Sequence, residues 1–302
     1  MTRHRGIAFV FAGLIAIAAA PEQSLAWGVD GHKIVALVAQ QFLDPAVKKK
    51  VDALLKSDKD KLTPTDIANR AVWADKYRDS DRNGAKVRYN ATRQWHFVDI
   101  ELNAPDYDKA CFGHPALPAG TVASKGPAAD CVADKILQFQ AELKDPKTSK
   151  AEQLLAFKFL LHFVGDIHQP LHDADNNDEG ANKVFVIFGK HTVAEKLHAY
   201  WDDVLPESLG KDVDQVAAML ADKFKDKKTA WMTGTPKDWA NESFALARDV
   251  AYKVPSKTTV DKDKVKCFVL DQAYDDKSRP VVSEQLAKGG MRLAMILNDA
   301  LK

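Results

Sequence analysis

Two histidines in this chain each stand four residues before an aspartate, within apolar segments that have helical spacing. The pairs are His162 with Asp166 and His198 with Asp202. Residues i and i+4 of an α-helix differ by about 40° of rotation and roughly 6 Å of rise, so each pair shares one helical face. If both segments are helices, each therefore presents an imidazole and a carboxylate to the same side.

An imidazole and a carboxylate presented in this way form half of a zinc site. Gln169 and Pro170 then end the first helix just before His172, which lets a third ligand leave that face. A salt-bridged helix pair is the alternative interpretation of one such spacing. Two pairs, with His172 close to one of them, favour metal binding, and nearby tryptophans would give the site stiff, dry surroundings.

Apolar residues at helical spacing recur along the chain, which predicts a mainly α fold. The segments are 32–43, 150–171, 212–224, 240–252 and 281–300. Residues 183–188, Lys-Val-Phe-Val-Ile-Phe, predict a strand that Gly189 and Lys190 would turn into a short β-hairpin. Residues 100–130 have the composition of a long loop, and no repeat or linker divides the chain. We therefore expect a single helical domain.

The N-terminus has the pattern of an exported protein. Two arginines precede an apolar run from Gly6 to Ala20 that is too short to span a bilayer comfortably. Pro21 ends this run, and Ser24-Leu25-Ala26 supplies the small residues of a signal-peptidase site. We expect residues 1–26 to be a signal peptide and residues 27–302 to be the mature domain, either periplasmic or secreted. An uncleaved membrane anchor is the alternative.

The mature chain has no net charge with which to attract a polyanion. The full sequence has 43 Lys and Arg against 42 Asp and Glu, and removal of residues 1–26 leaves 41 of each. This balance excludes a polybasic protein that holds nucleic acid by bulk electrostatics, so any phosphate substrate must be attracted locally. No later segment is apolar enough to span a membrane.

Export also permits disulfides. Cys111 and Cys131 bracket a loop rich in glycine, proline and alanine, which makes a disulfide between them plausible and leaves Cys267 over. Because the cysteines show no C-x-x-C spacing, they do not indicate a metal site.

Six motifs follow one another from Trp27 to the C-terminal segment. They are Trp27-Gly-Val-Asp-Gly-His32, Trp73-Ala-Asp75, Trp95-His-Phe97, Leu161-His-Phe-Val-Gly-Asp-Ile-His-Gln-Pro-Leu-His172, Leu197-His-Ala-Tyr-Trp-Asp202 and Leu286-Ala-Lys-Gly-Gly-Met-Arg-Leu293. With these motifs the chain resembles the S1/P1 nuclease family of zinc-dependent, secreted endonucleases and 3′-nucleotidases. The resemblance implies a mainly α-helical single domain of the phospholipase C/P1 nuclease type, with three zinc ions at the base of a cleft. We also expect a monomer.

The resemblance further implies a set of ligands for each zinc ion. One ion would be held by Asp75, His96, His162 and Asp166. A second, bridged to the first by Asp166, would be held by His32 and by the α-amino group and carbonyl of Trp27. The third would be held by His172, His198 and Asp202. Because the amine of Trp27 is free only after the signal peptide is removed, maturation would complete the site.

The implied reaction is hydrolysis of phosphodiester bonds in single-stranded DNA and RNA to products with 5′-phosphates, together with 3′-nucleotidase activity. In the implied mechanism, two bound zinc ions would lower the pKa of a water between them to near neutrality, and the resulting hydroxide would attack phosphorus. The catalytic residues would be Asp75, Arg78 and Asp166. Arg78 would contact the phosphate, and the other substrate-binding residues would be Phe97 under a base, Asp99 at its edge, and Asn182.

Two positions near the implied cleft depart from the family pattern. Gly180-Ala181-Asn182 stands where the family often has Gly-Gly-Asn, and Lys196 stands where it often has Asn. These departures bear on base preference rather than on metal binding.

Two other classes of protein remain as alternatives. A zinc phospholipase C has a similar fold and metal site, but it closes its ligand set with H-x3-E and has a longer spacing from the terminal tryptophan to its first histidine. Here the last pair ends in Asp202, and His32 follows Trp27 by five residues, which favours a nuclease. A secreted zinc-binding protein without turnover is the non-catalytic alternative.

Overall fold

The structure is a computed structural model that describes residues 27–189, 194–255, 259–262 and 265–302. The segment 1–26, for which we predict a signal peptide, and Lys190 of the predicted hairpin turn lie outside the described residues. Within the described ranges, no helix combines the length and apolar character needed to cross a membrane.

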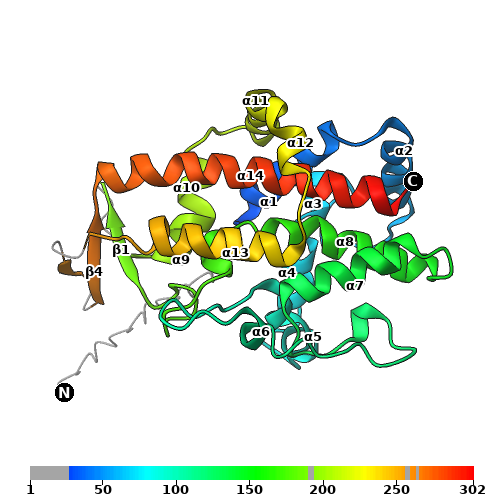
Figure 1. The fold of residues 1–302 in the computed structure, drawn as a ribbon, viewed down its shortest axis with the longest axis horizontal. Helices are drawn as coiled ribbons and strands as arrows, with labels where there is room; N and C mark the ends of the chain where they lie inside the picture. Colours follow the sequence, from blue (N-terminus) through cyan, green and yellow to red (C-terminus); the bar gives the residue numbers. More distant parts are fainter. Residues whose placement is uncertain (1–26, 190–193, 256–258, 263–264) are drawn as a thin grey trace, which may run out of the picture.

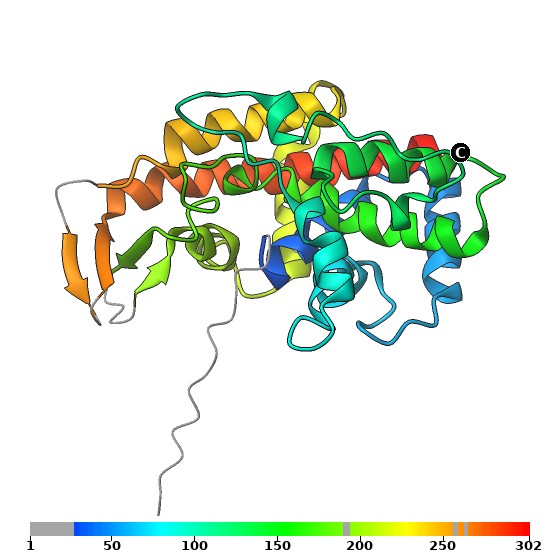
Figure 2. The same cartoon turned by 90° about the horizontal axis from the view of Figure 1, so that it is seen from below.

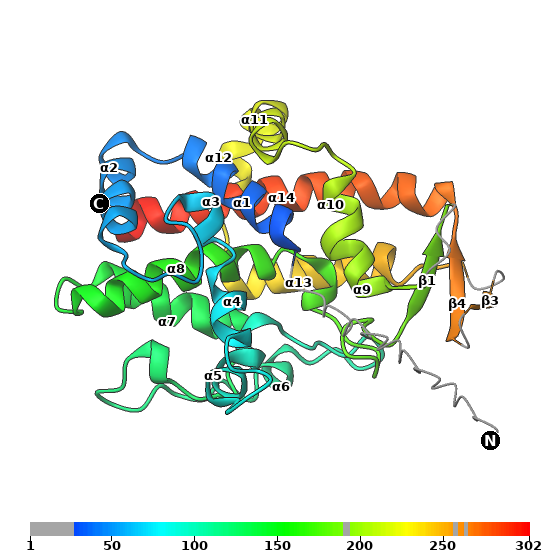
Figure 3. The ribbon, with the colours of Figure 1, turned by 180° about the vertical axis from the view of Figure 1, so that it is seen from behind.

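The centre of the molecule is formed by three helices that pack on one another (Figures 1 and 3). They are α1 (Val29–Gln41), α8 (Lys150–Asp166) and the long α14 (Gln272–Ala300). Every residue of α8 from Ala156 to Asp166 is buried. A helix that is buried all round belongs at the centre of a domain, and this position places the pair His162 and Asp166 in the interior.

Further helices cover this centre. They are α2 (Pro45–Ser57), α7 (Val132–Lys144), α11 (Val213–Phe224) and α13 (Pro236–Leu246), which continues as a π-helical turn over Ala247–Ala251. Among them, α7 packs against α8, and α11 packs against α1. The molecule is therefore a mainly helical single domain, as predicted.

Short helices carry most of the remaining chain. The α-helices are α3 (Ile67–Arg70), α4 (Trp73–Asp79), α5 (Val87–Thr92), α6 (Tyr107–Ala110), α9 (Leu197–Ala199), α10 (Leu205–Glu207) and α12 (Lys228–Trp231). The 3₁₀ turns are η1 (Arg93–His96), η2 (Ala123–Lys125), η3 (Pro170–His172) and η5 (Lys225–Lys227), and η4 (Tyr200–Val204) is a π-helical turn.

Local capping sets where several helices begin. The Ser149 side chain accepts a hydrogen bond from the Glu152 amide at the start of α8. Thr235 and Asp238 form a capping box at the start of α13. Each of these contacts satisfies backbone donors that the first helical turn leaves unpaired. The predicted segment 240–252 therefore begins too late, since the helix starts at Pro236.

The sheet is larger than the short hairpin that the sequence predicts. Its strand order is β2 (Glu195–Lys196), β1 (Phe185–Phe188), β4 (Val265–Leu270) and β3 (Thr259–Lys262), and all four strands lie at one end of the molecule (Figure 2). β1 and β2 are antiparallel, as a hairpin requires. β4 pairs with β1 in parallel, with Phe185 opposite Cys267. Two of the strands were therefore missed, because their pairing joins segments far apart in sequence.

The long loop over residues 100–130 contains only the short elements α6 and η2. The predicted disulfide between Cys111 and Cys131 is confirmed, and the two Cα atoms lie 4.9 Å apart. The Val132 amide, next to this disulfide, donates to the Phe97 carbonyl at 3.3 Å. Cys267 is buried in β4 and takes no part in the disulfide.

Candidate metal centre and substrate cleft

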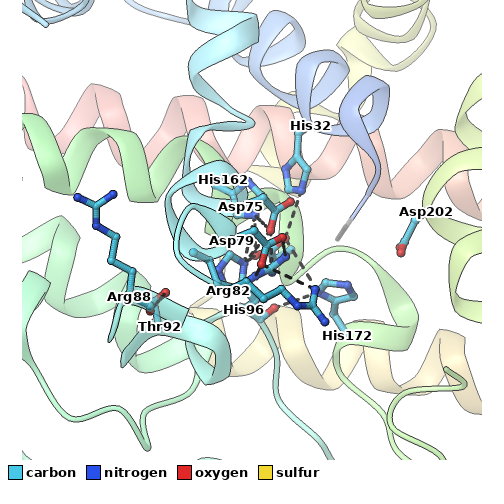
Figure 4. A network of polar contacts seen from close by, with 12 residues as sticks. His32, Asp75, Asp79, Arg82, Arg88, Thr92, His96, His162, His172 and Asp202 are labelled. Carbon is cyan, nitrogen blue, oxygen red and sulfur yellow. Dashed lines mark hydrogen bonds and ion pairs between the residues drawn. The ribbon is translucent and has the colours of Figure 1, made fainter. Parts of the chain in front are cut away.

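Four separate elements bring three histidines and two aspartates into one buried cluster. We call this set the inner cluster, and Figure 4 shows four of its members converging. His32 comes from α1, Asp75 from α4, His96 from η1, and His162 and Asp166 from α8. All five side chains are at most 2% exposed.

The Asp166 carboxylate lies between the imidazoles of the inner cluster. Its Oδ1 lies 3.3 Å from His32 Nε2, and its Oδ2 lies 3.0 Å from His96 Nδ1 and 3.3 Å from His162 Nε2. Asp75 Oδ1 lies 3.5 Å from the same His162 nitrogen. The two oxygens of Asp166 thus face different histidines, as a carboxylate that bridges two cations does.

Hydrogen bonding fixes the tautomer of His162. Its Nδ1 donates to the Ala71 carbonyl at 2.7 Å, so its Nε2 is the atom that faces the two carboxylates. Burial alone lowers the pKa of His162, but Asp166 and Asp75 raise it to about 9. Burial raises the pKa of Asp166 well above its usual value. Two buried carboxylates therefore need nearby positive charge if both are to be ionised. This set of imidazole and carboxylate donors fits a divalent cation such as zinc.

A second group of potential ligands lies nearby, formed by His172, His198 and Asp202, and we call it the outer cluster. Its candidate ligand atoms all lie within 4.8 Å of one another. His172 follows the break at Pro170, and the other two residues come from α9 and η4. The His172 and His198 Nε2 atoms are 3.1 Å apart, and His198 Nε2 is 3.3 Å from Asp202 Oδ2.

The donor set of the outer cluster also fits a cation. His172 Nδ1 donates to the His96 carbonyl at 2.9 Å, and His198 Nδ1 donates to the Gly180 carbonyl at 2.5 Å. With both Nδ1 atoms protonated, the neutral rings direct two Nε2 lone pairs toward each other. Burial lowers the pKa of His198 to about 4, which favours that neutral form. Two such lone pairs and a carboxylate are suited to bind a metal ion together.

Two residues to which our sequence interpretation gave no role in orienting metal ligands, Gln169 and Gly165, position these candidate ligands. The Gln169 side-chain amide donates to Asp202 Oδ1 at 2.5 Å and so orients that carboxylate. A Cβ atom on Gly165 would lie 2.8 Å from His32 Nδ1, so glycine is what lets the His32 ring approach α8. Trp27 is fully buried beside this ring, and its carbonyl accepts a hydrogen bond from the His32 amide at 3.3 Å.

Three of the candidate ligands line a cleft with a volume of about 340 Å³. Its lining includes the ligands His96, His172 and His198 and the residues predicted to bind substrate, namely Arg78, Phe97, Asp99 and Asn182. Lys196, where the sequence departs from the family pattern, also lines it, as does Gly180 beside the other departure, Ala181. The structure thus brings three of the predicted metal ligands and the predicted substrate residues to one surface, and the other predicted ligands are buried.

Two charged residues of the cleft have strongly perturbed environments. Arg78 Nη1 lies 2.7 Å from Asp75 Oδ1, and its guanidinium makes two further hydrogen bonds to Asp79. Although burial opposes ionisation of Asp75, Arg78 helps to hold the pKa of that carboxyl well below its usual value. Burial, Asp175 and neighbouring acids raise the pKa of Asp99 to about 7.

A family model described as S1/P1 Nuclease matches residues 27–302, which is nearly the whole chain. The chain belongs to the S1/P1 nuclease family. Nuclease S1 of Aspergillus oryzae is 32% identical over 291 residues, which cover 90% of this chain and 91% of that protein. Endonuclease 2 of Arabidopsis thaliana is 29% identical, with 90% and 89% covered. Nuclease P1 of Penicillium citrinum is 28% identical, with 90% and 97% covered.

Membership of the S1/P1 nuclease family makes the chain a phosphodiester-hydrolysing nuclease that acts on nucleic acid. The buried His and Asp clusters are candidate metal sites of this nuclease. The cleft also contains residues that our sequence interpretation did not assign, including Arg82, Tyr89, Arg93, Asp175 and Glu179. The excess of basic residues between positions 76 and 93 is the sequence signal that could have found the two arginines.

His168 lies within the longest family motif but outside both clusters. Its Nδ1 donates to the Val164 carbonyl at 2.7 Å, and its Nε2 accepts from Arg292 at 2.8 Å. Both ring nitrogens are thus occupied in the protein interior, next to Trp239. This arrangement is that of a packing residue that ties α8 to α14.

Proposed function

We propose that this S1/P1 nuclease is a zinc-dependent endonuclease that cleaves single-stranded DNA and RNA to products with 5′-phosphates and also removes 3′-phosphates from nucleotides. The observation that supports this most strongly is the outer cluster, where two histidines anchored through Nδ1 direct both Nε2 atoms toward one point. That arrangement lies in the same cleft as a basic, an aromatic and an acidic residue suited to a nucleotide.

Three zinc ions would be held by the residues of the two clusters. The inner cluster would hold two of them, with Asp166 between them and with Trp27 contributing its free α-amino group and carbonyl beside His32. The outer cluster would hold the third. Bound zinc supplies the means to lower the pKa of water to near neutrality and to neutralise charge on phosphoryl oxygens.

The chain's own groups would bind and orient the substrate. Arg78, held by Asp75 and Asp79, presents a fixed guanidinium to a phosphate in the cleft. Phe97 offers a ring on which a base stacks, and Asp99 offers a carboxyl to the polar edge of that base. Asn182 also lines the cleft, and the Lys196 ammonium donates to its side-chain oxygen at 3.4 Å.

We further propose that residues 1–26 direct export and are removed, and that the mature enzyme is a periplasmic or secreted monomer. The basic, apolar and small-residue order of that segment supports export. Cleavage before Trp27 would generate the amine that the second zinc ion requires.

The test is metal analysis of mature protein 27–302, together with assays on single-stranded DNA and on phosphatidylcholine vesicles. We expect three zinc ions per chain, cleavage of the DNA, and 5′-phosphates at the new ends. Cleavage of lipid with inert DNA would contradict the proposal and favour a phospholipase. Bound zinc without turnover of either substrate would indicate a zinc-binding protein instead.

A further inference from the structure

The cleft is lined by residues from one basic segment and from one acidic segment of the chain. We call Arg82, Tyr89 and Arg93 the arginine wall. They lie in the segment 76–93, which carries six basic and two acidic residues. The segment 173–182, which contributes Asp175 and Glu179 to the cleft, carries four acidic residues and no basic one. A polyanion in this cleft is therefore attracted to the residues of the basic segment and repelled by those of the acidic segment.

The arginine wall is held in place by hydrogen bonds at the start of α5. The Asp81 carboxylate accepts from the Arg88 amide at 2.8 Å and from the Tyr89 amide at 3.1 Å. The Arg82 guanidinium carbon lies 5.0 Å from the centre of the Tyr89 ring, within the range of a cation–π contact. An arginine and an aromatic ring are thus presented together at the cleft.

Arg93 differs from its neighbour Arg88 in what it faces. Arg93 is exposed and lines the cleft, and no hydrogen bond or ion pair engages its guanidinium among the residues that the structure describes. Arg88 instead donates to the Ser80 hydroxyl at 2.9 Å and lies over the Tyr77 ring. Figure 4 shows Arg88 pointing away from the metal ligands, whereas Arg82 reaches toward them. Arg88 is therefore a matched control on the same segment.

We propose that the arginine wall is a subsite for the neighbouring nucleotides of a single-stranded polynucleotide, beyond the phosphodiester that is cleaved. This inference rests on the proposed function. Arg82 and Arg93 bind backbone phosphates, and Tyr89 stacks against an unpaired base, which is how proteins hold single strands without reading sequence. A mononucleotide or dinucleotide is too short to use the wall fully.

The experiment compares a single-stranded 12-mer of DNA with a dinucleotide, using the zinc-loaded mature enzyme. In the double variant Arg82→Ala/Arg93→Ala, we expect KM for the 12-mer to rise about tenfold and the salt dependence of log KM to flatten by roughly one. Tyr89→Ala should raise KM for the 12-mer about fivefold, and Tyr89→Phe should restore it. For the dinucleotide, kcat and KM of these variants should stay within about twofold of the wild-type values.

The control is Arg88→Ala, which removes the same charge from the same segment but not from the cleft. An equal effect of Arg88→Ala, or an equal loss on both substrates, would overturn the subsite. If the wild type cleaves neither substrate, the proposed function fails, but binding of a labelled 12-mer still tests the wall by fluorescence anisotropy. Weaker binding in the double variant would then support it, and unchanged binding would refute it.

Discussion

At the scale of single residues, hydrogen bonds from the second ring nitrogen orient three of the candidate metal ligands. His162, His172 and His198 each donate from Nδ1 to a backbone carbonyl, which leaves Nε2 available to bind a metal ion. The Gln169 side-chain amide orients the Asp202 carboxylate in a similar way, by donating a hydrogen bond to its Oδ1. Such partners fix both tautomer and ring orientation, so ligand geometry is set before any metal binds.

Asp166 should be the residue on which two metal sites depend together. The variant Asp166→Asn removes the negative charge that faces His32 on one side and His96 and His162 on the other. We expect about two of three zinc ions to be lost, and kcat/KM to fall at least a hundredfold. Zinc counting by mass spectrometry checks this, and loss of a single ion would contradict the bridging role.

Asp99 should make substrate binding depend on pH near neutrality. Because burial and nearby acids raise its pKa to about 7, its carboxyl is protonated below that pH and ionised above it. If the carboxylate accepts from a base, KM for a dinucleotide should fall several-fold between pH 6 and pH 8. Asp99→Asn should give a higher KM that is flat over this range. A variant that keeps the wild-type pH profile would remove Asp99 from the substrate site.

At the scale of elements, the site depends on helices that approach one another closely. α1 supplies His32, and α14 packs against α1 at Gly290, where a Cβ atom would lie 2.4 Å from Val38 Cγ1. Only glycine allows the two backbones to come so near. The position of His32 against α8 is therefore a consequence of helix packing as well as of its own sequence.

Substitution of Gly290 should separate α1 from α14. We expect Gly290→Ala to destabilise the fold by about 2–4 kcal/mol, since the added methyl group overpacks a buried contact. Gly289→Ala is the matched control, because its Cβ atom would make ordinary contacts of 3.5 Å or more. Thermal unfolding of both variants measures the difference. Similar melting temperatures for the two would contradict the packing argument.

At the scale of the whole molecule, the chain is nearly neutral, with a formal net charge of +1, and many of its charged site residues lie at one cleft. The buried carboxylates and histidines form the candidate metal sites, and residues of the basic segment 76–93 and of the acidic segment 173–182 line the cleft. The enzyme thus needs no basic surface, because its candidate metals and a few arginines attract phosphate locally.

Processing of the N-terminus should control metal loading. A mature protein that carries one extra residue before Trp27 lacks the free amine at that position. We expect it to bind about one zinc ion fewer per chain and to lose most of its activity, with the fold retained. Zinc content and circular dichroism of the two forms provide the measurement. Full zinc content with an extended N-terminus would remove Trp27 from the ligand set.

Much of the helical core could be predicted from sequence, because periodic apolar residues and local caps act over a few positions. The segments 45–57 and 132–144 were nevertheless missed, and two strands of the sheet escaped prediction. β4 is a strand because it pairs with β1, which lies some 80 residues earlier. Non-local pairing of that kind leaves little trace in local sequence pattern.

The sequence by itself determined which residues are able to bind metal, since the spacing of His162 from Asp166 and of His198 from Asp202 puts each pair on one helical face. The tertiary structure decided how those pairs combine. Packing brings α1, α4 and η1 against α8 and aligns carbonyls such as those of Ala71 and Gly180 with the imidazoles. It also places the arginine wall beside the ligands. Distances between distant segments depend on how helices pack, and periodicity along one segment carries no information about them.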